Sequence, residues 1–207
     1  AKWFGQDRLL PELERVDRQT NDPAALQLVP SPVMAPGLAV LDAPDIDSVE
    51  EQNRVLAAQL LAAADLWLFV TSAARYADQV PWDFLRKAAD RSAAVAIVLD
   101  RTPPEAVDTI TTHLARMLAS RGLKDSPLFV VEEGEVSDLG LLAPSSVMEI
   151  RQWLRALAED QEARQSVVQQ TLDGAIRTLA RRTHSVADAA TEQVDAVRRL
   201  REDANEA

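Results

Sequence analysis

Short apolar runs alternate with helix-length segments along the chain. Five of these runs have the length of a strand, and the later ones are almost continuously apolar, which is typical of strands buried on both faces. They are residues 26–29, 38–41, 66–70, 94–99 and 128–131. This alternation predicts an α/β fold, in which helices cover a largely parallel sheet.

The first two runs are joined by residues 30–37, a connection that contains three prolines. It is too short to hold a crossover helix, so we expect these two strands to pair antiparallel. Ser48, Thr102 and Ser146 each precede a glutamate by three residues at the start of a helix-length segment. This spacing is typical of a capping box and predicts a helix start at each place.

The pattern becomes helical after Pro144. Apolar residues recur every three or four positions over residues 150–157, 168–179 and 186–200. A break between the last two groups is expected near residues 183–185. The pattern predicts a helical hairpin or the start of a helical bundle, and its apolar stripes need a partner surface.

The charge balance excludes one class of partner. Lys and Arg number 22 against 33 Asp and Glu, which gives a net charge of −11. Nucleic-acid binding needs a surplus of positive charge, so no nucleic-acid partner is expected. The chain has no cysteine, in keeping with a reducing, cytoplasmic compartment. No apolar run reaches the length of a membrane span, and association with a membrane surface stays open.

Two pairs of charged residues follow predicted strands. Asp42 and Asp45 come after the second run, and Asp100 and Arg101 come after the fourth. The carboxyl ends of strands are where open α/β sheets bind ligands. A carboxylate there can reach Mg²⁺ or accept two hydrogen bonds from a base edge. The alternative is that all four are ordinary loop residues beside helix starts.

The whole pattern resembles the G domain of dynamin-like GTPases, and most closely the bacterial members of actinobacterial type. The likeness covers about residues 24–160. It is carried by the antiparallel pair and by Leu-Asp-Ala-Pro-Asp-Ile-Asp-Ser at 41–48, the strand at 66–72, Tyr-Ala-Asp at 76–78 and Val-Leu-Asp-Arg at 98–101. The resemblance implies a P-loop NTPase-like sheet that binds GTP with Mg²⁺. It places Asp42 at the metal and the nucleotide, with Asp45, Asp100 and Arg101 also at the nucleotide.

The chain departs from the family pattern at its central motifs. No lysine follows a glycine or precedes Ser or Thr, so the phosphate loop and its strand are absent. Asp45 stands where the family has glycine, and Pro103 stands where the family has its guanine-reading Asp. The resemblance thus divides the chain into a partial G domain, 1–145, and a helical segment, 146–207. Because the chain opens without Met and stops in a helix-prone stretch, we expect a piece of a longer protein.

The functional expectation follows from the resemblance. The complete protein would hydrolyse GTP with Mg²⁺ to drive assembly or membrane remodelling, and its helices would mediate self-association. The chain alone is expected to be inactive. One alternative is a degenerate, nucleotide-free G-like scaffold. Another is a different nucleotide or phosphate enzyme on a flavodoxin-like sheet, with Asp42 and Asp45 holding a metal.

Overall fold

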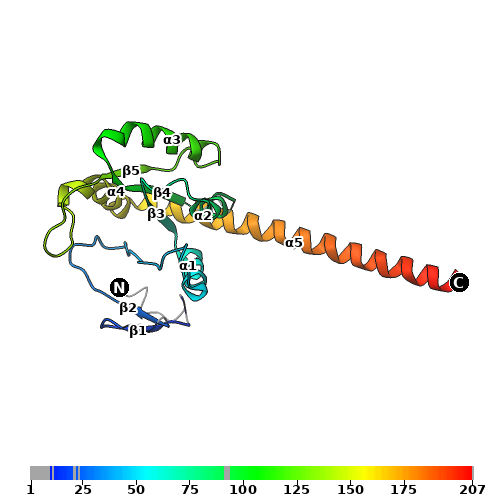
Figure 1. Cartoon of the computed structure of the whole chain (residues 1–207). Helices are drawn as coiled ribbons and strands as arrows, with labels where there is room; N and C mark the ends of the chain where they lie inside the picture. The colour runs from blue at the N-terminus through cyan, green and yellow to red at the C-terminus, as the bar shows by residue number, and fades with distance from the viewer. Residues whose placement is uncertain (1–9, 11, 21, 23, 91–93, 207) are drawn as a thin grey trace.

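The computed structural model describes residues 10, 12–20, 22, 24–90 and 94–206 (Figure 1). In chain order its elements are β1 (Glu14–Val16), β2 (Ala25–Gln27), α1 (Glu51–Ala63), β3 (Leu66–Ser72), α2 (Gln79–Asp90), β4 (Ala94–Thr102), the 3₁₀ turn η1 (Pro104–Ala106), α3 (Val107–Ala119), β5 (Leu128–Glu132), the 3₁₀ turn η2 (Pro144–Val147), α4 (Met148–Glu159) and α5 (Gln161–Glu206). The fold is α/β, with small parallel sheets and a long C-terminal helix.

The main sheet has three parallel strands in the order β3-β4-β5. This confirms the parallel, helix-covered sheet that the three later apolar runs predict. In β4 every residue from Ala94 to Leu99 is buried. A parallel strand in the middle of a sheet needs cover on both faces, which explains why its sequence is apolar throughout instead of alternating.

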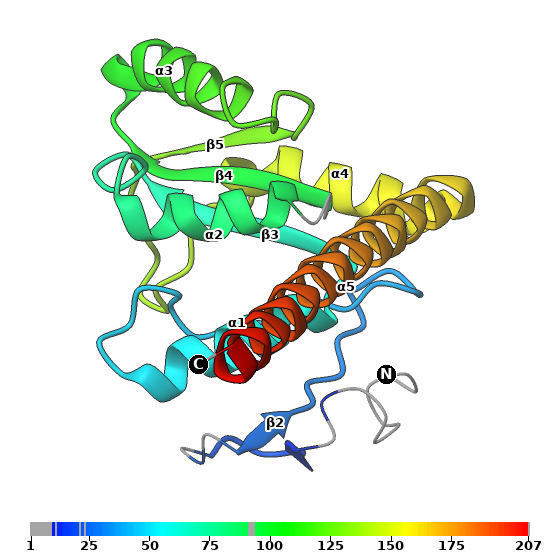
Figure 2. The same cartoon turned by 90° about the vertical axis from the view of Figure 1, so that its right-hand side faces the viewer.

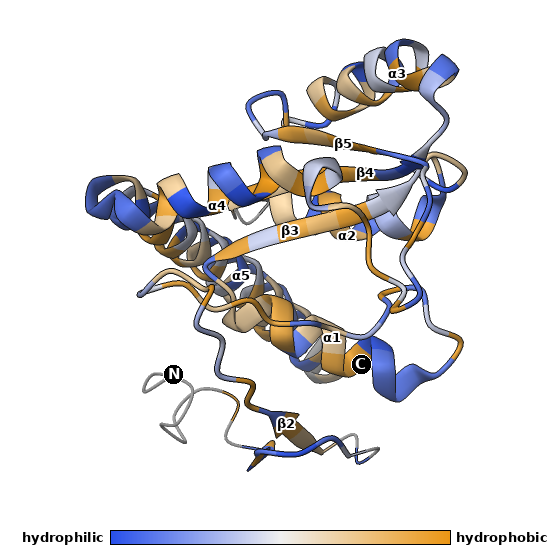
Figure 3. Ribbon diagram, turned by 90° about the vertical axis from the view of Figure 1, so that its left-hand side faces the viewer, coloured by the Kyte–Doolittle hydropathy of each residue, from blue (hydrophilic) through white to orange (hydrophobic). Residues whose placement is uncertain are grey.

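Helices cover both faces of this sheet. On one face, side chains of α2 and α3 pack against β3 and β4 in a core of Trp67, Trp82, Leu85, Val95, Ile97, Leu99, Leu114 and Leu118. On the other face lies α4, whose Trp153 ring is 5.3 Å from the Phe129 ring of β5. Figures 2 and 3 show α2 and α4 on opposite sides of the sheet, and Figure 3 shows the apolar colouring of its strands.

The predicted antiparallel pair at the start of the chain is wrong. Only residues 26 and 27 of the first run lie in a strand, β2, and this strand pairs in parallel with β1. Residues 38–41 form no strand. The prolines at 30, 32 and 36 lack amide hydrogens, which disfavours a regular hairpin between the two runs. No neighbouring strand in the described part of the chain offers residues 38–41 a hydrogen-bond ladder.

Helices begin close to the three predicted positions, but the predicted capping-box hydrogen bonds do not form. α1, α3 and α4 follow the three Ser/Thr positions, yet no cap residue makes a side-chain cap bond. The Ser48 hydroxyl instead accepts the Glu50 amide at 3.3 Å, before the helix begins. Thr102 is fully buried, and its hydroxyl donates to the Leu99 carbonyl at 3.4 Å. η1 and η2 provide the tight turns that precede α3 and α4.

A single helix of 46 residues, α5, replaces the predicted hairpin. The break expected near 183–185 is wrong because that stretch holds neither proline nor glycine. Its polar side chains bond within the helix: the Thr183 hydroxyl donates to the Leu179 carbonyl at 2.9 Å, and His184 Nδ1 lies 2.9 Å from the Ala180 carbonyl oxygen. The helix runs about 69 Å and extends well past the sheet (Figure 1). Within the described residues, no helix is both long and apolar enough to cross a bilayer.

Thr171 fixes α5 to the amino-terminal end of the sheet. Its hydroxyl donates to the Asp65 carbonyl at 2.8 Å and accepts the Ala94 amide at 3.4 Å. One side chain therefore joins the helix to the starts of β3 and β4.

We expect Thr171→Val to lower the free energy of unfolding by about 1 kcal/mol, since two hydrogen bonds are lost with little change in shape. Thr191→Val is the matched control. Its hydroxyl bonds only to Ala187 in the same helix, so urea denaturation should show a clearly smaller loss. Equal losses in the two variants would contradict the anchoring role.

Candidate functional site

A β-bulge at the end of β4 turns one cationic side chain outward. The ladder between β4 and β5 shifts register between Leu99 and Thr102. Inside this shift Arg101 has a φ of 48°, in the left-handed region that side chains rarely adopt. Thr102 consequently returns to the core, while the Arg101 side chain is 71% exposed. Bulges of this kind commonly re-aim a side chain beside a functional site.

A depression of about 490 Å³ lies where Arg101 emerges, and its size is that of a small-molecule site. The lining comes from the end of β3 and the turn after it, from the end of β4, from α3 and from the residue after β5. The lining residues are Ser72, Ala73, Ala74, Arg75, Arg101, Pro103, Ile110 and Glu133. The depression thus gathers loops from the carboxyl ends of all three strands, as ligand sites of α/β sheets do.

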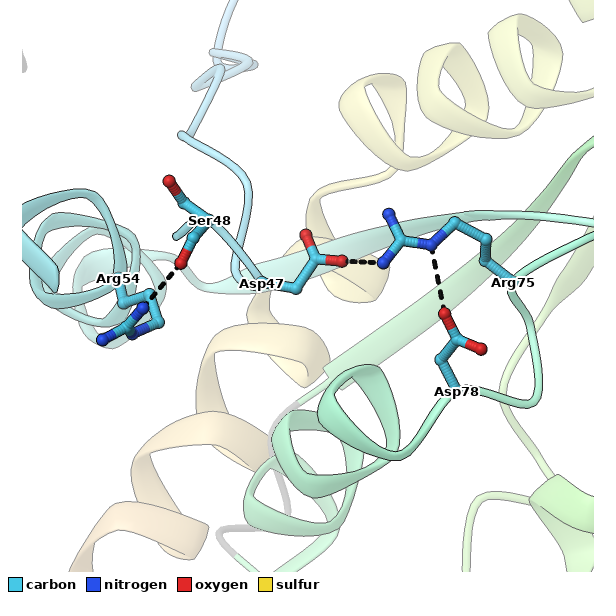
Figure 4. Close-up of polar contacts among 5 residues, drawn as sticks. All are labelled: Asp47, Ser48, Arg54, Arg75 and Asp78. Atoms are coloured by element: carbon cyan, nitrogen blue, oxygen red, sulfur yellow. Dashed lines mark hydrogen bonds and ion pairs between the residues drawn. The ribbon is translucent and has the colours of Figure 1, made fainter. Parts of the chain in front are cut away.

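Arg75, in the turn after β3, bridges two carboxylates (Figure 4). Its Nε donates to Asp78 Oδ2 at 3.1 Å, and its Nη2 pairs with Asp47. The hydrogen bonds to Asp78 and then to Asp47, together with the charge of Asp47, raise the pKa of the Arg75 guanidinium. Asp47 belongs to the segment before α1, so this ion pair ties that segment to the carboxyl edge of the sheet.

The segment before α1 is also held from the helix side. Arg54 Nη1 donates to the Ser48 carbonyl at 2.6 Å (Figure 4). Asn53 Nδ2 donates to the Ser48 hydroxyl at 3.2 Å. Residues 47 and 48 are therefore held from two directions: Asp47 by Arg75 at the sheet, and Ser48 by Asn53 and Arg54 of α1.

The four residues singled out from the sequence separate into two pairs. Arg101 lines the depression, and Asp100 is beside it, with Oδ2 3.6 Å from Arg101 Nε. Asp42 and Asp45 are exposed and do not line the depression. Since residues 38–41 form no strand, Asp42 does not stand at a strand end. Within the described residues, no group of three or more His, Asp or Glu side chains is arranged to hold a metal ion.

Sequence reasoning missed the residues that organise this edge, Arg75 and Asp47. They are 28 positions apart, and no motif spacing joins them. The only available signal was position, because Arg75 lies just after the third apolar run. Asp47 was visible as one of three acids in residues 42–47, and nothing in the sequence indicates which of the three reaches the sheet.

The electrostatics of the edge limit what it can bind. Guanidinium groups suit carboxylates and phosphates, and two of them, Arg75 and Arg101, lie at the depression. However, Asp47, Asp78 and Asp100 form ion pairs with these arginines. A fourth carboxylate, that of Glu133, also lines the depression. An incoming anion therefore meets a surplus of negative charge. A neutral group rich in hydrogen-bond donors, such as a base edge, fits this edge better than a phosphate does.

We expect Arg75→Gln to release the segment before α1, because Asp47 would lose its charged partner. Amide hydrogen exchange over residues 42–50 should accelerate, while exchange in β4 stays unchanged. Arg86→Gln is the matched control, since Arg86 pairs only with Asp83, one turn earlier on α2. Unchanged exchange over residues 42–50 in Arg75→Gln would show that the ion pair does not hold the segment.

No protein-family model, no curated protein and no solved structure matches this chain. The functional argument therefore depends on the strand order, the carboxyl-edge depression and the charged groups around it.

Proposed function

We propose that the chain is part of a dynamin-like GTPase, with the depression at the carboxyl edge as its base-side subsite. The observation that carries the proposal is the convergence of loops from β3, β4 and β5 on one depression of small-molecule size. Open α/β sheets bind nucleotides at this edge. Asp100 and Arg101 at the end of β4 would face the base.

The open edge of β3 supports a P-loop NTPase-like sheet that lacks its first strand. Within the described residues β3 is paired on one side only, with β4. Leu68 and Val70 of β3 are 37% and 59% exposed. A further parallel strand against this edge would shield both side chains and offer residues 38–41 a ladder. The loop at its carboxyl end would supply the phosphate-binding amides that this chain lacks.

In the complete protein each part has a role. Water would be the nucleophile, and the assistance would be mainly electrostatic. Asp42 would reach Mg²⁺, and Asp45 would present its amide near the phosphates. The Arg75–Asp47 pair would connect this segment to the base side. The helices would transmit the nucleotide state to self-assembly or to remodelling of a membrane from the cytoplasmic side.

A nucleotide-free scaffold is the second candidate, and the charges at the depression favour it. Both arginines already have carboxylate neighbours, and the edge carries more negative than positive groups. A fold of this kind would keep the sheet as a rigid platform and act through protein contacts alone. The two candidates differ in one measurable respect, which is nucleotide binding by the complete protein.

For the chain alone we expect no GTP binding tighter than about millimolar. It has neither the amide ring nor the lysine that hold the β- and γ-phosphates, and its net charge of −11 repels a tetra-anion. Isothermal titration calorimetry with GTP and Mg²⁺ measures this directly. Micromolar affinity would contradict the proposal that the phosphate site lies outside this chain.

For the longer protein that the proposal requires, we expect Asp42→Ala to abolish Mg²⁺-dependent GTP hydrolysis without loss of fold. The exposed Asp42 side chain is not a packing residue. Asp138→Ala, an exposed acid in the loop after β5, is the matched control and should keep wild-type turnover. Wild-type turnover in Asp42→Ala would refute its role at the metal. A longer protein that binds no GTP would favour the scaffold.

A further inference from the structure

A continuous apolar stripe runs along α5. Its large aliphatic residues recur every three or four positions, with gaps at Thr183 and Ala190, and so lie on one side of the helix. Between 45% and 69% of each residue is exposed. The stripe consists of Val168, Leu172, Ile176, Leu179, Val186, Val194, Val197 and Leu200. Small residues fill the remaining places on this side, including Ala190.

The stripe is not the face that joins α5 to its own domain. The contacts to the rest of the chain come from Arg164, which donates to the Ala158 carbonyl, from Thr171 at the sheet, and from the buried Gly174. At 100° per residue, Arg164, Thr171 and Gly174 lie about 65°, 85° and 145° from the middle of the stripe, so the contacting face borders the stripe on one side. Within the described residues, every residue of the stripe stays at least partly exposed, and Val168 and Leu172 beside the sheet are about half exposed.

We infer that the stripe pairs with the same stripe of a second copy of this chain, in an antiparallel arrangement centred on Val186. The distribution of charge determines the direction. α5 carries seven Arg and eight Asp or Glu, a net charge of −1, so helix-to-helix approach is not opposed. The rest of the chain holds 15 Lys and Arg against 25 Asp and Glu, a net charge of −10.

A parallel pair would bring two sheet domains of charge −10 side by side. An antiparallel pair centred on Val186 puts the two Thr171 anchors 30 residues apart along the paired helices. At 1.5 Å per residue this is about 45 Å, several times the Debye length of about 8 Å at physiological salt. The antiparallel arrangement thus buries the stripe without the repulsion between domains.

The stripe is nearly symmetric about Val186, as an antiparallel pair of identical helices requires. Large residues then meet large residues: Leu172 faces Leu200, Ile176 faces Val197, Leu179 faces Val194, and Val186 faces itself. The small pair Thr183 and Ala190 coincides in the same register, which lets the helices approach closely there. These pairs have residue numbers that sum to 372 or 373.

Charges on the flank of the stripe fit this register as well. Asp173 lies thirteen residues before Val186, and Arg198 lies twelve residues after it. The two are almost seven helical turns apart, so they share one flank. In the antiparallel pair each Asp173 comes level with Arg198 of the other copy. Within one copy Arg198 pairs with Asp195 at 3.1 Å and Asp173 accepts a hydrogen bond from Gln169 at 2.7 Å, so an ion pair between copies would compete with these contacts.

Sedimentation velocity of the chain at tens of micromolar tests the pairing. We expect a dimer that Val186→Asp converts to monomer, because that variant places two carboxylates face to face at the centre. Ser185→Asp is the matched control, since it adds the same charge one residue away, about 100° around the helix from Val186 and outside the stripe, and should remain dimeric. Circular dichroism verifies that both variants keep their helix. A monomeric wild-type chain, or a dimer insensitive to Val186→Asp, overturns the inference.

Cysteine cross-linking tests the direction, and the natural chain contributes no background because it has no cysteine. A Leu179→Cys chain mixed with a Val194→Cys chain should form the mixed disulfide on oxidation. Leu179→Cys alone should not cross-link, since its two copies would be about 21 Å apart, far beyond disulfide reach. Val186→Cys should cross-link with itself. Efficient cross-linking of Leu179→Cys alone indicates a parallel pair and overturns the arrangement, as does failure of the mixed pair.

Discussion

The burial of β4 is the constraint on which the rest of the fold depends. Ile97 and Leu99 are fully buried, and so is Ala96, which points to the opposite face. A strand that is apolar on both faces requires helices above and below, and α2, α3 and α4 meet that requirement. The same strand determines the site, since its carboxyl end must leave the core. At the bulge formed by Asp100 and Arg101 the strand passes from the core to the surface: Thr102 stays buried, and the Arg101 side chain points to solvent.

The sequence predicts well those parts of the fold that depend on the residues of a single segment. The strands at 66–72, 94–102 and 128–132 are recognisable because each begins with an apolar run, at 66–70, 94–99 and 128–131, and has polar residues only at its carboxyl end. Residues 38–41 look equally apolar, yet form no strand. An apolar run indicates that a segment is stabilised by burial. A strand also needs a neighbouring strand whose backbone N–H and C=O groups are free to pair with it. Composition cannot show whether such a neighbour is present.

The site was predictable to a similar extent and for the same reason. Asp100 and Arg101 follow a buried strand, so their place at the carboxyl edge could be read from position alone. Asp42 and Asp45 were placed by a strand that does not form. The Arg75–Asp47 pair forms because two loops lie side by side in the fold, and no motif or spacing in the sequence predicts that the two loops are neighbours. This pair also shows why the edge is a poor phosphate site by itself: its cations are already engaged by carboxylates.

The length of α5 raises a separate physical question. Residues 179–201 are all exposed, so in the described part of the chain no residue of this half of the helix is buried. In proteins most of the stability of a helix comes from tertiary packing of its apolar face, because local propensities alone contribute little. Gly174 weakens those propensities further near the point where the helix leaves the sheet. A helix that is continuous here therefore draws its stability from the anchored half or from a second surface laid along the stripe. In the second case, the order of the outer half is coupled to association, and the acidic sheet domains, by repelling each other, select the geometry in which that association occurs.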